Sequence, residues 1–363
     1  MRKAIHTIFV LAAAALLWTG CDDKSVPGEN RGRAIDFSCS AEKSRAQATT
    51  AENIASFRVS AVWTKAANDY APKYMDKQAV DKIDGIWTYS PVCYMPSYGS
   101  VDFFAYSPAE ASVSDFGFGG EPYDNLSLAY DVTSDPAAQH DFMVAANLKT
   151  LRTPVQLEFQ HALSSVRVTA RSAVSGTTFR VYDVKLLNLN RKGVLSAQTG
   201  GDPQTTNWTW SAQSDLTTYT IAQNGPVDAS ATSVAISDPD VGPLMVLPQT
   251  VEIGNKDDVV ESNEIAADQY PAWMLGLPRD VRSSFYVAAT YEPVDGGGSI
   301  TGIKTTVYLP LADLDDPSQP FTFEMGKRYV LHIDIEQIET RSANLSLPSG
   351  ATSARLSITT EDE

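Results

Sequence analysis

Cys21 is the first residue of the chain whose type and position predict a chemical reaction. Two positive residues, Arg2 and Lys3, precede an apolar run from Ile8 to Leu17, and a small residue stands directly before the cysteine. These are the marks of a signal peptide. A run of about ten residues is too short to cross a bilayer core of ~30 Å. The sequence therefore predicts removal of residues 1–20 and acylation of Cys21 on its thiol and its amine.

An ordinary secretory peptide followed by an unmodified cysteine is the alternative, because Trp18 stands where lipoproteins usually carry Leu or Val. Downstream of Cys21 there is no further run of about eighteen apolar residues. If Cys21 is acylated, its lipid is the only membrane attachment that the sequence predicts.

The peptide bond between Arg45 and Ala46 is the second place that predicts chemistry. It lies in the polar stretch AEKSRAQATTAEN, and an exposed chain of this kind is open to a protease that prefers arginine. Arg58 lies in a predicted strand and should be protected. The alternative is that Arg45 is simply a solvated arginine.

The histidines do not predict a catalytic or metal site. His140 and His161 stand in unrelated segments, and His332 is followed two residues later by Asp334. No spacing typical of zinc, a nucleophile elbow or a phosphate-binding loop occurs. We therefore expect no enzyme, no metal and no cofactor.

Trp208 and Trp210 alternate in the stretch NWTW and should share one face of a strand. If that face is exposed, the indoles could stack on a sugar ring or a protein partner. Packing in a core is the other interpretation, and the sequence favours it.

Composition narrows the class of partners. The chain has 363 residues, a formal net charge of −16 and no basic patch. Nucleic acid is therefore not an expected partner, because phosphate binding relies on clustered Lys and Arg. The length is sufficient for two domains of ordinary size.

These sites must be positioned by strands, because strand signals recur along the chain and a sustained helical period is absent. The stretches FRVSAVW, WTYSPVCYMP and VDFFAYSP are rich in β-branched and aromatic residues. Further predicted strands are 155–159, 166–171, 179–189, 208–210, 219–221, 244–248, 284–291, 305–309 and 329–335. Asp135 and Pro136 predict at most one short helical turn.

Many short strands separated by Pro and Gly predict an all-β protein of two β-sandwich domains in tandem after the signal peptide. We expect a tether with a first strand over 21–50, an N-terminal sandwich over 51–160 and a C-terminal sandwich over 161–363. Within the tether, AIDFSCS alternates Ile35, Phe37 and Cys39 against polar neighbours, the period of a half-buried strand.

The chain continues past the last predicted core strand with two further alternating pairs. Leu345 with Leu347 and Leu356 with Ile358 are separated by a Pro-Ser-Gly break. Either pair could belong to a strand that leaves the molecule. The alternative is a last edge strand of the C-terminal domain.

In this order, FRVSAVW, IWTYSPVCYMP, VDFFAYSP, DFMVAANLKTLRTPVQLEFQHALSSVRVTAR, PLMVLPQ and FEMGKRYVLHIDI resemble the fimbrillin family of Bacteroidota. The resemblance implies transthyretin-like β-sandwiches on a surface lipoprotein that forms type V pili. It also implies that an Arg-specific protease removes the lipidated segment with its first strand, and that a C-terminal strand of a neighbouring subunit fills the groove.

Carried onto this sequence, the resemblance implies lipidation at Cys21 and attachment to the outer membrane, with Asp22, Asp23 and Lys24 as a surface-export signal. It also implies cleavage between Arg45 and Ala46. Other pilus subunits would then be the partners. Anchor and tip proteins share the fold without all sharing the cleavage, so a non-polymerising adhesin that binds a glycan or a host or bacterial protein remains the alternative.

Cys39 and Cys93 allow two incompatible outcomes. A disulfide between them would tie the first strand to the body and block its release, whereas a small apolar Cys39 would leave the strand removable. The spacing of the two cysteines matches no redox or metal motif. We favour the second outcome.

Overall fold

The computed structural model describes residues 32–41, 54–198, 207–250, 253–254, 282–283, 286–311, 321–337 and 352–360. Within these ranges the protein is all β, as predicted, with the single 3₁₀ turn η1 (Pro136–Ala138). Asp135 caps that turn, because its carboxylate accepts a hydrogen bond of 3.0 Å from the Ala137 amide. No helix long and apolar enough to span a membrane occurs among the described residues.

The first sheet has seven strands. In spatial order they are β1 (Phe37–Ala41), β9 (Val155–His161), β8 (Met143–Thr150), β5 (Ser100–Ser107), β2 (Ser56–Ala66), β3 (Asp69–Ile83) and β4 (Ile86–Thr88). The stretch WTYSPVCYMP was predicted as a strand, but strand structure ends at Thr88 and only Tyr94 makes an isolated bridge. Pro91 and Pro96 lack the amide hydrogens that a longer ladder requires.

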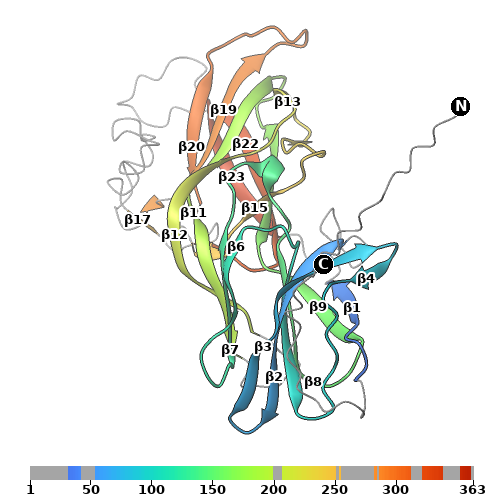
Figure 1. The fold of residues 1–363 in the computed structure, drawn as a ribbon. Coiled ribbons are helices and arrows are strands. Elements are labelled where there is room, and N and C mark those ends of the chain that lie inside the picture. Colours follow the sequence, from blue (N-terminus) through green and yellow to red (C-terminus); the bar gives the residue numbers. More distant parts are fainter. Residues whose placement is uncertain are drawn as a thin grey trace, which may run out of the picture.

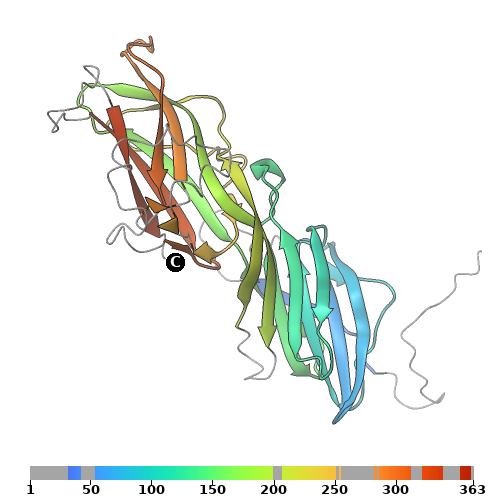
Figure 2. The ribbon, with the colours of Figure 1, turned by 90° about the vertical axis from the view of Figure 1, so that its left-hand side faces the viewer.

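The second sheet runs through the whole molecule. Its order is β20 (Thr305–Pro310), β19 (Tyr286–Val294), β11 (Thr178–Gln198), β7 (Asn125–Asp131) and β6 (Val113–Phe118), and β12 (Thr209–Thr220) and β13 (Val227–Ala229) also pair with β11. The 21-residue β11 pairs with β19 over Thr178–Leu187 and with β7 over Lys192–Gln198. One strand therefore serves both ends of the elongated molecule (Figures 1 and 2).

The third sheet covers the C-terminal end. It contains β14 (Val234–Ala235), β10 (Ser164–Ser172), β22 (Arg328–Gln337) and β23 (Thr352–Thr360), with β15 (Leu244–Val246) beside β10. Two small pairs complete the described strands: β16 (Gln249–Thr250) with β21 (Thr322–Phe323), and β17 (Ile253–Gly254) with β18 (Arg282–Ser283).

The strands enclose two hydrophobic cores. The larger core packs the second sheet against the third sheet and, at its other end, against the first sheet through residues such as Phe104 and Phe142. The smaller core lies on the opposite face of the first sheet and includes Ile35 and Phe37. A domain boundary near residue 160 stays a prediction, since β11 returns to the N-terminal end after that point.

Candidate functional site

The first strand buries the apolar face that its alternation predicts and exposes the polar one. Ile35 and Phe37 are buried, with 1% and 6% of their surface exposed, Cys39 is half-buried, and Asp36 and Ser38 face solvent. Strand β1 begins at Phe37, so Ile35 belongs to the extended residues that lead into it.

On one side, β1 pairs in parallel with β9, with Phe37 opposite Val155 and Ala41 opposite Phe159. The Val155 amide donates to the carbonyl of Asp36 at 2.7 Å. Next to this ladder, the Thr153 hydroxyl accepts from the Asp36 amide at 2.9 Å. The first strand therefore adds a ladder to the edge of the seven-stranded sheet.

On the other side, residues 89–95, here called the facing segment, hold the start of the strand. The Ile35 amide donates to Cys93 O at 2.9 Å, and the Met95 amide donates to Arg33 O at 2.8 Å. The Tyr89 hydroxyl donates to Ile35 O at 2.8 Å. The first sheet has β4 at one edge and β1 beside β9 at the other. The facing segment directly follows β4 and contacts residues 33–35, so these residues connect the two edges of the sheet. We call the space between β9 and the facing segment, filled by residues 33–41, the β1 slot.

Phe37 fills the centre of the β1 slot. Its ring makes edge contacts with Phe57, Tyr89 and Phe103 at centroid distances of 5.3, 5.7 and 6.2 Å. Such aromatic contacts add to the free energy gained by burying the ring. Withdrawal of the strand would remove this ring from the smaller core and expose the backbone edges of β9 and the facing segment to water.

The two cysteines are thiols and do not form a disulfide. Burial raises the pKa of the Cys39 thiol to about 12, against a smaller opposing effect of Lys82. Cys93 is buried, with 4% of its surface exposed. Cys39 therefore occupies the slot as a small apolar side chain.

Four predicted sites lie outside the described residues: Cys21, the Arg45–Ala46 bond, Leu345 and Leu347. The described part of the first strand ends at Ala41, four positions before Arg45. Their lipidation, cleavage and donor roles stay predictions.

The other two tail residues lie on β23, the edge strand of the third sheet. β23 pairs antiparallel with β22 from Thr352 to Thr360. Leu356 is buried, with 7% of its surface exposed, and Ile358 packs half-buried against the larger core. In this chain β23 is an edge strand of its own sheet, which is the alternative that the sequence left open.

Trp208 and Trp210 pack against the larger core. The Trp208 ring stacks on Phe104 at 5.2 Å, and Trp210 Nε1 donates to Ala162 O at 2.8 Å. Both indoles are half-buried. Core packing accounts for both, and the large aromatic residues that are exposed in the described ranges lie elsewhere, at Tyr94 and Tyr98.

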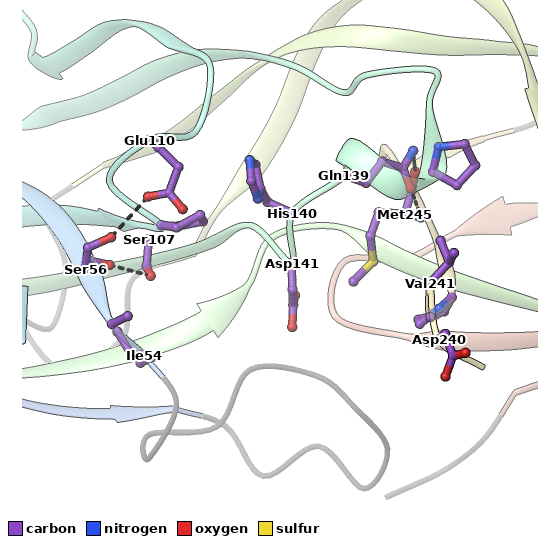
Figure 3. Close-up of a pocket in the computed structure, with 15 residues that line it drawn as sticks. Ile54, Ser56, Ser107, Glu110, Gln139, His140, Asp141, Asp240, Val241 and Met245 are labelled. Carbon is purple, nitrogen blue, oxygen red and sulfur yellow. Dashed lines mark hydrogen bonds between the residues drawn. The ribbon is translucent and has the colours of Figure 1, made fainter. Parts of the chain in front are cut away.

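A cavity of about 520 Å³ opens where η1 meets the loops before β2, after β5 and before β15 (Figure 3). Most of its polar groups join these segments to one another. The Ser56 hydroxyl donates to Glu110 at 3.2 Å, the Met245 amide donates to Gln139 Oε1 at 2.7 Å, and Asp141 bonds to His161 Nδ1 at 2.9 Å. No cluster of three metal-ligating side chains occurs in the described parts of the chain.

Sequence reasoning missed both the facing segment and this cavity. Tyr89 carried only a strand prediction, and Cys93 was linked to the first strand only through the disulfide alternative with Cys39, whereas the structure joins both residues to Ile35 by hydrogen bonds. Gln139 and His140 directly follow the short turn that Asp135 caps, and their place beside residues 240–245 depends on the tertiary fold.

Comparison with known proteins decides the family. The fimbrillin-like family matches residues 44–352. The chain belongs to the fimbrillin-like family. That family consists of fimbrial and adhesion structural proteins, so membership indicates a structural class and gives no support for catalysis.

Solved structures similar to this fimbrillin-like chain are distant. A candidate cell adhesion protein of Bacteroides uniformis is 14% identical, with a TM-score of 0.46, over 90% of this chain and 98% of that one. The tip fimbrial protein Mfa3 of Porphyromonas gingivalis, truncated at its C-terminus, is 12% identical, with a TM-score of 0.34. The match covers 84% of this chain and 93% of that one. A candidate cell adhesion protein of Parabacteroides distasonis is 10% identical, with a TM-score of 0.40, over 90% of this chain and 96% of that one. No curated protein matches the chain.

Proposed function

We propose that this protein is a fimbrial subunit that is exported as a lipoprotein and assembled by strand replacement, and that it serves adhesion at the cell surface. Acyl chains on Cys21 hold the precursor in the outer membrane. An Arg-specific protease cuts between Arg45 and Ala46, and the first strand then leaves with the lipid. A tail strand of a neighbouring subunit enters the β1 slot.

The observation that best supports this proposal is the construction of the β1 slot. Ile35 and Phe37 are core residues, yet they belong to a short segment whose backbone bonds to the facing segment at residues 33–35 and pairs with β9 at residues 37–41. A peptide with matching alternation can restore both the backbone hydrogen bonds and the buried side chains. Because the tail of one subunit would fill the slot of the next, the contact is head-to-tail and propagates as a filament.

Cleavage is tested at the arginine itself. We expect Arg45→Ala and Arg45→Lys both to leave a full-length, acylated monomer and to abolish filaments, because an Arg-specific protease rejects lysine. Lys43→Ala is the matched control and should be processed normally. N-terminal sequencing of surface material reads out the cut, and normal filaments from both Arg45 variants would contradict the proposal.

The tail offers two donors, and the structure suggests how to separate them. β23 presents Ala354, Leu356 and Ile358 on one face, the same spacing as Ile35, Phe37 and Cys39. If β23 is donated, the double variant Leu356→Ser, Ile358→Ser should stop assembly. If β23 stays on β22, the double variant Leu345→Ser, Leu347→Ser should stop assembly instead.

A non-polymerising anchor or tip adhesin is the second candidate. The observation that favours it is the pairing of β23 with β22 along its whole length, which gives that strand a place in the sheet of its own chain. This candidate predicts that the protein stays acylated and uncut in surface material. Its ligand, a glycan or a host or bacterial protein, would then bind the body directly.

A further inference from the structure

Exposed apolar side chains gather around the point where the chain enters the folded body. Ten large apolar residues of the described part are exposed. Four of them, here called the apolar rim, stand within three sequence positions of a residue that contacts residues 33–36: Val92, Tyr94, Tyr98 and Leu151. Between 40% and 55% of the surface of each is exposed.

Backbone contacts fix the apolar rim to this entry point. Ala34 forms a bridge with Tyr94. On the opposite side, the Thr153 hydroxyl, two residues after Leu151, donates to Ala34 O at 3.2 Å. A Cβ atom on Gly32 would lie 2.1 Å from Met95 O, so the chain enters tightly against the facing segment.

A rigid aromatic base supports the two tyrosines. Trp63 Nε1 donates to Tyr98 O at 3.0 Å, and the Trp63 ring lies 5.2 Å from the Tyr98 ring and 5.5 Å from Tyr74. The Tyr74 hydroxyl in turn donates to Tyr94 O. Gly99, with φ +78°, allows this close approach, since a Cβ there would lie 2.2 Å from Thr64 O. The rim is therefore held in place.

We propose that the apolar rim lies on the lipid–water interface of the membrane that holds the acylated precursor. Gly32 is eleven positions after Cys21, so even a fully extended chain places the rim within about 40 Å of the acyl chains. Tyrosine and tryptophan prefer this interface because they join an apolar ring to a polar group. The tether keeps the local concentration of the membrane high, so the weak contact of a small rim is sufficient.

This inference rests on the proposed acylation of Cys21 and adds an orientation to it. The precursor would lie with the entry side of the β1 slot on the membrane. Cleavage after Arg45 would free the body together with its open slot, so the slot would face water only after release.

The test uses the full chain in cells that acylate lipoproteins, with photoreactive benzoylphenylalanine placed at Tyr98. The matched control position is Ile303, which is 77% exposed. It belongs to the connection between β19 and β20, and that connection lies at the other end of the molecule (Figure 1). We expect crosslinks to lipid from position 98 and none from position 303. Repeating the crosslink on purified protein in vesicles of phosphatidylethanolamine and phosphatidylglycerol removes other proteins from the experiment.

The mass of the N-terminal peptide is measured in the same samples. An acylated protein that crosslinks equally from both positions, or only to other polypeptides at position 98, overturns the membrane contact and leaves the proposed acylation intact. An unacylated Cys21 overturns both. With the photoreactive residue at Val92, the double variant Tyr94→Ser, Tyr98→Ser should lose lipid crosslinks while it remains acylated.

Discussion

The two edge strands β1 and β23 share an alternation but are held in different ways. β23 rests on an antiparallel ladder from Thr352 to Thr360 along an open sheet edge. β1 has a ladder of only five residues, and it is parallel, the pairing that is slightly less stable per residue. Phe37 compensates for this, because its ring contacts three aromatic residues. β1 therefore depends on side-chain packing, whereas β23 depends on its backbone ladder.

The largest expected effect concerns the reactivity of Cys39. A rise of its pKa from 9.0 to about 12 lowers the thiolate population at pH 8 by roughly three orders of magnitude. The precursor should therefore be alkylated very slowly at Cys39, and cleavage at Arg45 should restore an ordinary rate. Mass spectrometry of timed iodoacetamide reactions measures both rates, with Arg45→Ala as the uncut control.

The same shift sets a pH dependence. Because the folded pKa of Cys39 is raised, burial of the neutral thiol stabilises the fold below pH 9.0, and this contribution is lost as the pH rises towards 12. Equal alkylation rates before and after cleavage would show that β1 is already open in the precursor, and the contrast with β23 would fail.

The next effect is on stability. Phe37→Ala should lower the free energy of unfolding of the uncut chain by about 3–5 kcal/mol, the usual range for a buried phenylalanine. Denaturant titration measures it. Ser38→Ala is the matched control on the exposed face and should change the stability by less than about 0.5 kcal/mol.

A smaller loss is expected on β23. Leu356→Ala should lower the unfolding free energy by about 2 kcal/mol, the lower end for a buried leucine, because one side of an edge strand faces solvent. Ser357→Ala, on the face of β23 opposite to Leu356, is the control. If Leu356→Ala proved more destabilising than Phe37→Ala, then β23 would be the strand that depends on packing.

The smallest effect concerns acid and the sheet that carries β23. Arg171 on β10 donates two hydrogen bonds, of 2.7 and 2.6 Å, to Asp334 on β22, and these bonds lower the pKa of Asp334. A lowered folded pKa gives stability that is present above the ordinary value of 3.8 and lost as the pH falls through the folded value.

Since this pair is partly exposed, we expect a loss below about 1 kcal/mol. Denaturant titration of Asp334→Asn and of the unchanged chain, each at neutral pH and near pH 3, measures the free energy of unfolding. The variant should show a smaller loss in acid, and identical acid dependence would contradict the assignment.

The sequence alone determined the features that depend on local pattern. Alternation in AIDFSCS placed Ile35 and Phe37 inside and Asp36 outside, since side chains of a strand point to opposite faces in turn. Frequent β-branched and aromatic runs predicted the all-β class, and ordered motifs indicated the fimbrillin family.

Only the tertiary structure decided which strands are neighbours. The partner of β1 is β9, more than a hundred residues later, and the facing segment that holds Ile35 follows β4. The same holds for β11, whose length joins both ends of the molecule, and for Trp208, which stacks on Phe104. Periodicity fixes which face of a strand is apolar, but pairing depends on the free energy of the whole packed chain, to which distant residues contribute as much as neighbours.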